Sequence, residues 1–277
     1  MFTTLISAEA LAARLGDVIL VDCRHDLMLP SAGRAAYEAG HLPGAVFADM
    51  EHDLAGPKRD ADGIFKGRHP LPSQEDFIAV LRRWGVNDDS QVVAYDAHGG
   101  MYAARLWWML RWVGHAAVAV LDGGMATWQG ELTTAPAPAR APGNIAVRPA
   151  LVATVDAPAL VANLSSQALQ VIDARAPDRF RGENETIDPV GGHIPGAKNR
   201  FFKDNLAADG RFKPADDLRA ELAMVGDPAR AVMQCGSGVT ACHNLLALEV
   251  AGLPGAKLYP GSWSEWSADS SRPVARD

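Results

Sequence analysis

The stretch Gly40-His41-Leu42-Pro43-Gly44-Ala45 recurs as Gly192-His193-Ile194-Pro195-Gly196-Ala197, at an offset of 152 residues. An apolar run that ends on an acid precedes each copy, Asp17 to Asp22 in the first half and Leu169 to Asp173 in the second. In both halves an arginine follows that acid two positions later. A short apolar run bounded by polar residues is typical of a buried strand. The repeated order predicts an internal duplication.

Further landmarks follow in the same order in both halves. A second apolar strand leads into a loop of small residues and an apolar helix, and each half then has a third strand and a turn with glycine and tryptophan. The paired strands are Gln91 to Asp96 with Ala231 to Cys235, and Val118 to Leu121 with Lys257 to Tyr259; the helices are Tyr102 to Val113 and Val239 to Val250; the turns hold Trp128 and Trp266. Strands that alternate with helices predict an α/β fold of two tandem domains, each a parallel sheet flanked by helices.

The length of 277 residues suits two domains better than one. A proline-rich stretch, residues 133–143, separates the two halves and resembles an extended surface linker. We therefore predict a first domain over residues 1–135, a linker over 136–150 and a second domain over 151–277.

The composition argues against several classes of protein. The formal net charge is −7 with no basic cluster, which argues against nucleic acid or an anionic membrane as a partner. The N-terminus has no basic region before an apolar one, and no apolar run reaches membrane-spanning length. The three cysteines, Cys23, Cys235 and Cys242, form no Cys-x-x-Cys pair. This usage favours a reducing, cytoplasmic setting, and the scattered histidines suggest neither a metal nor a cofactor.

Cys235 has the sequence context of a nucleophile. It ends a strand and precedes Gly236 and Gly238, and an apolar helix follows. Glycines permit backbone angles at which successive N–H groups turn inward, and a helix N-terminus adds positive potential. Both effects stabilise a thiolate and the negative charge of a bound persulfide. Asp96 holds the matching position in the first half, so only the second half carries a nucleophile.

Together these motifs resemble the tandem-domain rhodanese family over nearly the whole chain. The match includes the Asp-x-Arg and Gly-His-x-Pro-Gly-Ala pairs, the loop Cys235-Gly236-Ser237-Gly238-Val239-Thr240, and Gly261 to Trp266. The resemblance implies an inactive first domain and a catalytic second one. It implies a sulfurtransferase in which Cys235 takes a sulfane sulfur as a persulfide and passes it to a thiol, a thioredoxin-like protein or cyanide. Gly236, Gly238, Val239 and Thr240 would line the substrate site.

The interior of that loop bears on the sulfur donor. Thiosulfate-preferring members look like Cys-Arg-Lys-Gly-Val-Thr, whereas the two cationic positions here are Gly236 and Ser237. This form resembles 3-mercaptopyruvate sulfurtransferases, whose donor leaves as a pyruvate enolate that needs a proton. Thiosulfate as the preferred donor stays open as an alternative, and a non-catalytic sulfur carrier or binding module is a more remote one. A phosphatase would need an arginine six residues after the cysteine, where Ala241 stands.

The resemblance also implies further site residues. His69 resembles the cleft histidine of mercaptopyruvate enzymes, and Glu51 the acid beside it, so a relay from Ser237 through His69 to Glu51 follows. Arg179 matches the family's arginine for the donor carboxylate. A second arginine usual in that subfamily is missing, and Asp188 falls near its place.

Other polar residues have structural explanations. Arg24 and Arg175 follow acids at strand ends and are expected to hold loops. His41 and His193 occur in both halves, of which only one has a nucleophile, so they are expected to be structural too. Cys242 is predicted to be a buried apolar residue.

Overall fold

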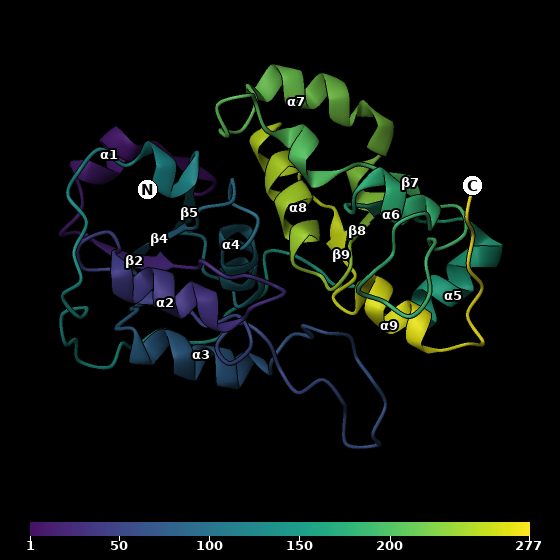
Figure 1. Ribbon diagram of the computed structural model, residues 1–277, viewed down its shortest axis with the longest axis horizontal. Helices are drawn as coiled ribbons and strands as arrows, with labels where there is room; N and C mark the ends of the chain where they lie inside the picture. The colour runs from purple at the N-terminus through teal and green to yellow at the C-terminus, as the bar shows by residue number, and fades with distance from the viewer. The chain divides into compact units, whose positions relative to one another are not determined.

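The computed structural model describes residues 1–277, which form two compact α/β units (Figure 1). The first unit comprises Met1–Gly56, Pro72–Leu151 and Ala207–Phe212. The second comprises Pro57–Leu71, Val152–Leu206 and Lys213–Asp277. The units are therefore not two uninterrupted halves of the chain. The segment Pro57–Leu71, which carries His69, belongs with the second unit.

The first unit has a five-stranded parallel sheet in the order β1-β5-β4-β2-β3. Its strands are β1 (Leu5–Ile6), β2 (Val18–Asp22), β3 (Val46–Phe47), β4 (Gln91–Tyr95) and β5 (Val118–Leu121). Strands β2 and β4, predicted from their apolar runs, lie side by side with Val18 opposite Gln91 and Asp22 opposite Tyr95.

The second unit has a four-stranded parallel sheet in the order β7-β6-β8-β9. Its strands are β6 (Gln170–Asp173), β7 (Lys198–Asn199), β8 (Ala231–Gln234) and β9 (Lys257–Leu258). This order repeats β3-β2-β4-β5 of the first unit. Thr154 forms a single parallel bridge to Leu258, in the place that β1 takes beside β5. The duplication predicted from the sequence is therefore confirmed strand by strand.

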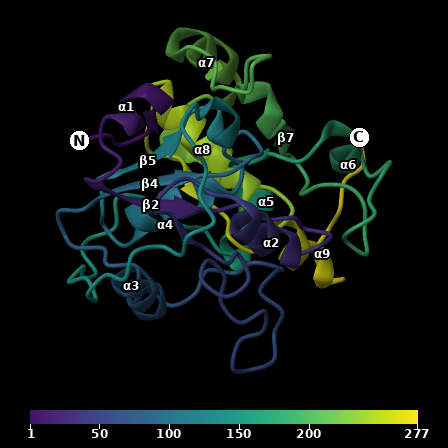
Figure 2. The ribbon, with the colours of Figure 1, turned by 60° about the vertical axis from the view of Figure 1, so that its left-hand side comes forward.

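Helices flank both sheets. The first unit has α1 (Ala8–Ala12), α2 (Ser31–Ala39), α3 (Gln74–Arg83), α4 (Ala103–Trp112) and η1 (Gly124–Thr127). The second has α5 (Ala157–Ser166), α6 (Pro177–Arg181), η2 (Phe202–Asn205), α7 (Ala215–Glu221), η3 (Leu222–Val225), η4 (Pro228–Arg230), α8 (Thr240–Val250) and α9 (Ser262–Ala268). Helix α8 packs against strands β8 and β9 and against α7, which lies next to it in Figure 2. None of these helices is long and apolar enough to cross a bilayer.

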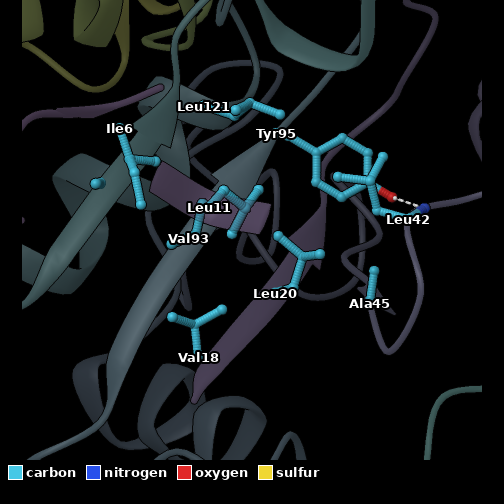
Figure 3. Packing of buried hydrophobic residues seen from close by; sticks show 10 residues of the cluster. Ile6, Leu11, Val18, Leu20, Leu42, Ala45, Val93, Tyr95 and Leu121 are labelled. Atoms are coloured by element: carbon cyan, nitrogen blue, oxygen red, sulfur yellow. Dashed lines mark hydrogen bonds between the residues drawn. The ribbon is translucent and has the colours of Figure 1, made fainter. Parts of the chain in front are cut away.

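The core of the first unit shows what the Gly-His-x-Pro-Gly motif does there. Leu42 packs among buried side chains of β1, β2 and β4 (Figure 3). Its backbone N–H donates to the hydroxyl of Tyr95 at 3.2 Å, and that hydroxyl donates to Asp22 at 2.8 Å. The motif thus fastens the loop before β3 to the ends of the two central strands.

Two local expectations need correction. Trp266 lies within helix α9 instead of a turn, because Trp263 and Trp266 are one helical turn apart and both fill the core of the second unit. The proline-rich stretch is extended, but it is anchored on the first unit: Gly143 donates to the carbonyl of Arg82, and Ile145 is buried.

Candidate active site

Cys235 directly follows strand β8, at the carboxyl end of the second sheet, and its side chain is buried. The backbone N–H of Gly238 donates to Sγ of Cys235 at 3.2 Å. Gly238 has φ +77°, and a Cβ there would lie 2.4 Å from the carbonyl oxygen of Pro260, so the turn requires glycine. Helix α8 then starts at Thr240, after Val239 as its N-cap residue. The sulfur therefore lies in a turn with an N–H aimed at it, next to a helix N-terminus.

The start of helix α9 holds this loop from the other side. The backbone N–H of Cys235 donates to Oγ of Ser262 at 3.1 Å, and the N–H of Ser264 donates to the carbonyl of Gly236 at 3.0 Å. Ser262 is buried and has φ +54°, which is costly for a residue other than glycine. The stretch Gly261 to Trp266 is part of the motif found in the sequence, but the role of Ser262 was not predicted from it. The serine that directly follows Gly261 is the sequence feature that could have indicated this role.

In the equivalent loop of the first unit, backbone N–H groups bind the side-chain carboxylate of Asp96. Four backbone N–H groups donate to it at 2.8–3.0 Å, those of His98, Gly100, Tyr102 and Ala103. Asp96 is fully buried, and these bonds offset the loss of its hydration. In the first unit, the loop after β4 is thus built to hold negative charge. In the second unit, Cys235 stands where Asp96 stands in the first.

His69 and Ser237, predicted to act together, are brought together within the second unit. Nδ1 of His69 lies 2.8 Å from Oγ of Ser237, and both side chains are buried. Glu51, the third member of the predicted relay, lies in the first unit, where its backbone N–H donates to Asp49 at 2.9 Å. Its part in the relay stays a prediction.

Arg179, the predicted substrate arginine, lies on helix α6 and is bound by acids. Nε and Nη2 donate to Glu185 at 2.8–3.1 Å, and Nη2 also reaches Asp188 at 3.3 Å. The other carboxylate oxygen of Asp188 pairs with Nη1 of Arg68. Asp188 thus bridges the guanidinium groups of Arg68 and Arg179, and Arg68 is not among the site residues predicted from the sequence.

The two acids of this cluster differ in their electrostatics. Burial alone would raise the pKa of Glu185, but hydrogen bonds from Arg179 and from the backbone N–H groups of Ile187 and Asp188 outweigh it and hold that pKa below its usual range. Burial raises the pKa of Asp188, although Arg68 and Arg179 act in the opposite direction. The cluster therefore holds one strongly ionised carboxylate and one that is harder to ionise.

The other two cysteines are placed differently. Burial, followed by the charges of Asp22 and Asp96, raises the pKa of Cys23 well above its ordinary value, so its reactive thiolate form is disfavoured. Cys242 is completely buried in helix α8, and its thiol donates to the carbonyl of Gly238 at 3.3 Å. The prediction that Cys242 is a buried residue is confirmed.

The repeated arginines and histidines have structural roles, as predicted. Arg24 makes a two-pronged ion pair with Asp22 and donates to the carbonyl of Gly40, and Arg175 does the same with Asp173 and Gly192. The two motif histidines also bond to backbone carbonyls, His41 to Tyr37 and Ala135, and His193 to Phe180.

Comparison with known proteins identifies the fold family. The Rhodanese-like domain matches the chain twice, over residues 7–131 and 156–269. The chain belongs to the rhodanese family. It is 48% identical over 280 residues to the "Probable 3-mercaptopyruvate sulfurtransferase" of Pseudomonas aeruginosa, covering 98% of this chain and 97% of the relative. It is 36% identical over 244 residues to the thiosulfate sulfurtransferase of Mus musculus, covering 84% and 79%.

A solved structure gives the same result in three dimensions. The rhodanese fold of this chain matches the 3-mercaptopyruvate sulfurtransferase from Leishmania major with a TM-score of 0.86 at 29% identity, covering 98% of this chain and 76% of that one. Because its relatives are sulfurtransferases over nearly the full length, this chain is a sulfurtransferase enzyme.

Proposed function

We propose that this rhodanese transfers the sulfur of 3-mercaptopyruvate, through a persulfide on Cys235, to a thiol or cyanide acceptor. The observation that carries the proposal is the contact between His69 and Ser237, a residue of the Cys235 loop. A hydroxyl linked to an imidazole can deliver a proton, and mercaptopyruvate is a donor whose carbon leaving group requires one. The 3-mercaptopyruvate sulfurtransferases among the relatives support the same donor.

In the first half-reaction, the thiolate of Cys235 attacks the sulfur of 3-mercaptopyruvate. An S–S bond forms while the C–S bond breaks, and its electron pair passes to carbon as the enolate of pyruvate. Ser237, backed by His69, supplies a proton to that carbon, and pyruvate leaves. The N–H of Gly238 and the N-terminus of α8 stabilise negative charge on the sulfur.

In the second half-reaction, an acceptor attacks the outer sulfur of the persulfide. The S–S bond breaks and its electron pair returns to Cys235 as a thiolate. A small thiol, a thioredoxin-like protein or cyanide meets this chemical requirement. All three cysteines are free thiols, which agrees with our proposal of a cytoplasmic, reducing setting.

Thiosulfate is the second candidate donor, and one observation favours it. A Cβ atom at Gly236 would lie 2.7 Å from Arg68 and 3.9 Å from Arg179. The loop itself is uncharged, but two guanidinium groups lie beside it and could bind a dianion. The expectation drawn from the uncharged Gly236 and Ser237 therefore holds only if Asp188 and Glu185 offset the charges of Arg68 and Arg179.

Steady-state kinetics with each donor and cyanide as acceptor, followed by thiocyanate release, tests the proposal. We expect a higher kcat/KM with 3-mercaptopyruvate than with thiosulfate. A preference for thiosulfate would select the second candidate. Failure of both donors to yield thiocyanate would favour a non-catalytic binding module.

A further inference from the structure

Arg68 is a cation beside the catalytic loop that neither the resemblance nor the comparisons assign. It lies in the segment Pro57–Leu71, which belongs to the same unit as Cys235. Where mercaptopyruvate enzymes usually have a second arginine, this chain has Asp188, and the carboxylate of Asp188 contacts Arg68. The structure thus holds a guanidinium close to the position where the sequence motif lacks one.

The geometry at Gly236 places two guanidinium groups against one face of the loop. A Cβ atom there would lie 2.7 Å from Nη2 of Arg68 and 3.9 Å from Nη1 and Nη2 of Arg179. Arg68 pairs with Asp188 through Nη1, so Nη2 is the end that lies nearest the loop. Gly236 comes directly after Cys235, and an anionic group bound at this face would lie next to the nucleophile.

The backbone and side chain of Arg68 are both fixed. The backbone N–H of Arg68 donates to Oγ of Ser264 at 3.1 Å. The backbone N–H of Ser264 in turn donates to the carbonyl of Gly236. Nε of Arg68 is buried and has no hydrogen-bond partner in the protein. An unsatisfied donor of this kind costs free energy until a ligand or water accepts from it. Arg68 is therefore prearranged and has hydrogen-bonding capacity to spare.

A cavity opens onto the Arg68 and Asp188 end of this cluster. Arg68 and Asp188 line a cavity of about 470 Å³ together with Phe65, Ile187 and Ser264. The side chain of Arg68 is 19% exposed and that of Arg179 is 20% exposed, whereas that of Asp188 is only 3% exposed. The two cations are accordingly more accessible to an incoming anion than the acid that joins them.

We propose that Arg68 is a binding residue for the carboxylate of the sulfur donor, acting as the second arginine beside Arg179. Asp188 is a positioning residue, since it holds the Arg68 guanidinium at the Gly236 face. A planar guanidinium offers a carboxylate two parallel N–H groups, which an ammonium group cannot do. The inference rests on the proposed function, because it names the residue that would bind that donor.

The experiment measures how well pyruvate protects Cys235 from alkylation by iodoacetamide, a neutral reagent. Pyruvate carries the donor's carboxylate and keto group but has no sulfur to transfer. Arg68→Met removes the charge and keeps an aliphatic side chain of similar length. Arg68→Lys keeps the charge but removes the paired N–H donors of the guanidinium. Arg181→Met is the matched control, because Arg181 is an exposed arginine of the same helix as Arg179 and pairs with Glu183.

We expect Arg68→Met to raise the pyruvate concentration for half-protection by about 10- to 100-fold, and Arg68→Lys to raise it less. In steady-state assays, KM for 3-mercaptopyruvate rises correspondingly, while kcat changes little. Protection that stays at the wild-type value, or that changes no more than in Arg181→Met, would overturn the proposal. If Arg68→Met does not fold, a wild-type protection curve in Arg68→Lys would overturn it instead.

Different results test the role of Arg68 and the use of 3-mercaptopyruvate as the donor. Wild-type enzyme that fails to use 3-mercaptopyruvate would remove the proposed function. Protection by inorganic sulfate, a dianion that cannot transfer sulfur, would still report whether Arg68 binds anions beside Cys235. Loss of sulfate protection in Arg68→Met would then reassign Arg68 to a thiosulfate site.

Discussion

Nδ1 of His69 lies 2.8 Å from Oγ of Ser237, although the two residues are 168 positions apart in the chain. The segment that carries His69 lies in the first half of the sequence and belongs to the second structural unit. The contact places an imidazole next to the only hydroxyl of the Cys235-Gly236-Ser237-Gly238 turn. This is the arrangement that a proton-delivering pair requires.

If that pair protonates the pyruvate enolate, His69→Ala slows 3-mercaptopyruvate turnover by about 10²-fold or more, the usual scale for losing acid–base help. Thiosulfate turnover falls less, because sulfite leaves without needing a proton. Ser237→Ala is the matched variant: it should show a similar loss, and the double variant should lose little more than either single one. Equal losses with both donors would recast His69 as a structural residue.

The charge of Asp188 should influence the choice of donor. Asp188→Asn keeps the shape and one acceptor oxygen toward Arg68, but it adds one positive charge to the cluster. A positive charge added near the donor attracts a dianion more strongly than a monoanion, by about 1.4 kcal/mol or roughly tenfold in a partly screened site. The ratio of kcat/KM for thiosulfate to that for 3-mercaptopyruvate should therefore rise about tenfold. An unchanged ratio would mean that Asp188 does not act on the donor through its charge.

Glu185 should make a pH-dependent contribution to stability. Its folded-state pKa is below the usual value, so its contribution is fully present above the unfolded-state pKa of about 4.3. That contribution is lost as the pH falls through the folded-state pKa. Glu185→Gln keeps an acceptor for the N–H groups of Ile187 and Asp188 but removes the charge that pairs with Arg179.

We expect Glu185→Gln to lower the free energy of unfolding by about 1.5–3 kcal/mol at pH 7, the range for hydrogen bonds to charged groups. Urea unfolding at pH 7 and at pH 3.5 measures the difference, which should be smaller at the lower pH. Glu183→Gln, at a solvent-exposed ion pair, should change the free energy of unfolding far less than Glu185→Gln does. A loss that is independent of pH for Glu185→Gln would contradict the assignment.

Much of the fold could be predicted from the sequence because its signals are local. Apolar runs that end on an acid mark β2 and β6, and Cys235 is followed by glycines and then a helix. The role of Arg68 could not be predicted, since its partner Asp188 is 120 positions away and the pair forms only when Pro57–Leu71 packs with the second unit. The helix that holds Trp266 was missed because its stability comes from tertiary packing.

The most direct test of a Cys235 persulfide is peptide mass spectrometry after treatment with 3-mercaptopyruvate and no acceptor. The account predicts an addition of one sulfur, about 32 Da, on the peptide with Cys235 and none on those with Cys23 or Cys242, because Cys235 is the thiol with the loop geometry for thiolate chemistry. Cyanide should then remove the added mass and release thiocyanate. A Cys235→Ser variant that still releases thiocyanate, or wild-type enzyme with its extra sulfur on another cysteine, would contradict the account.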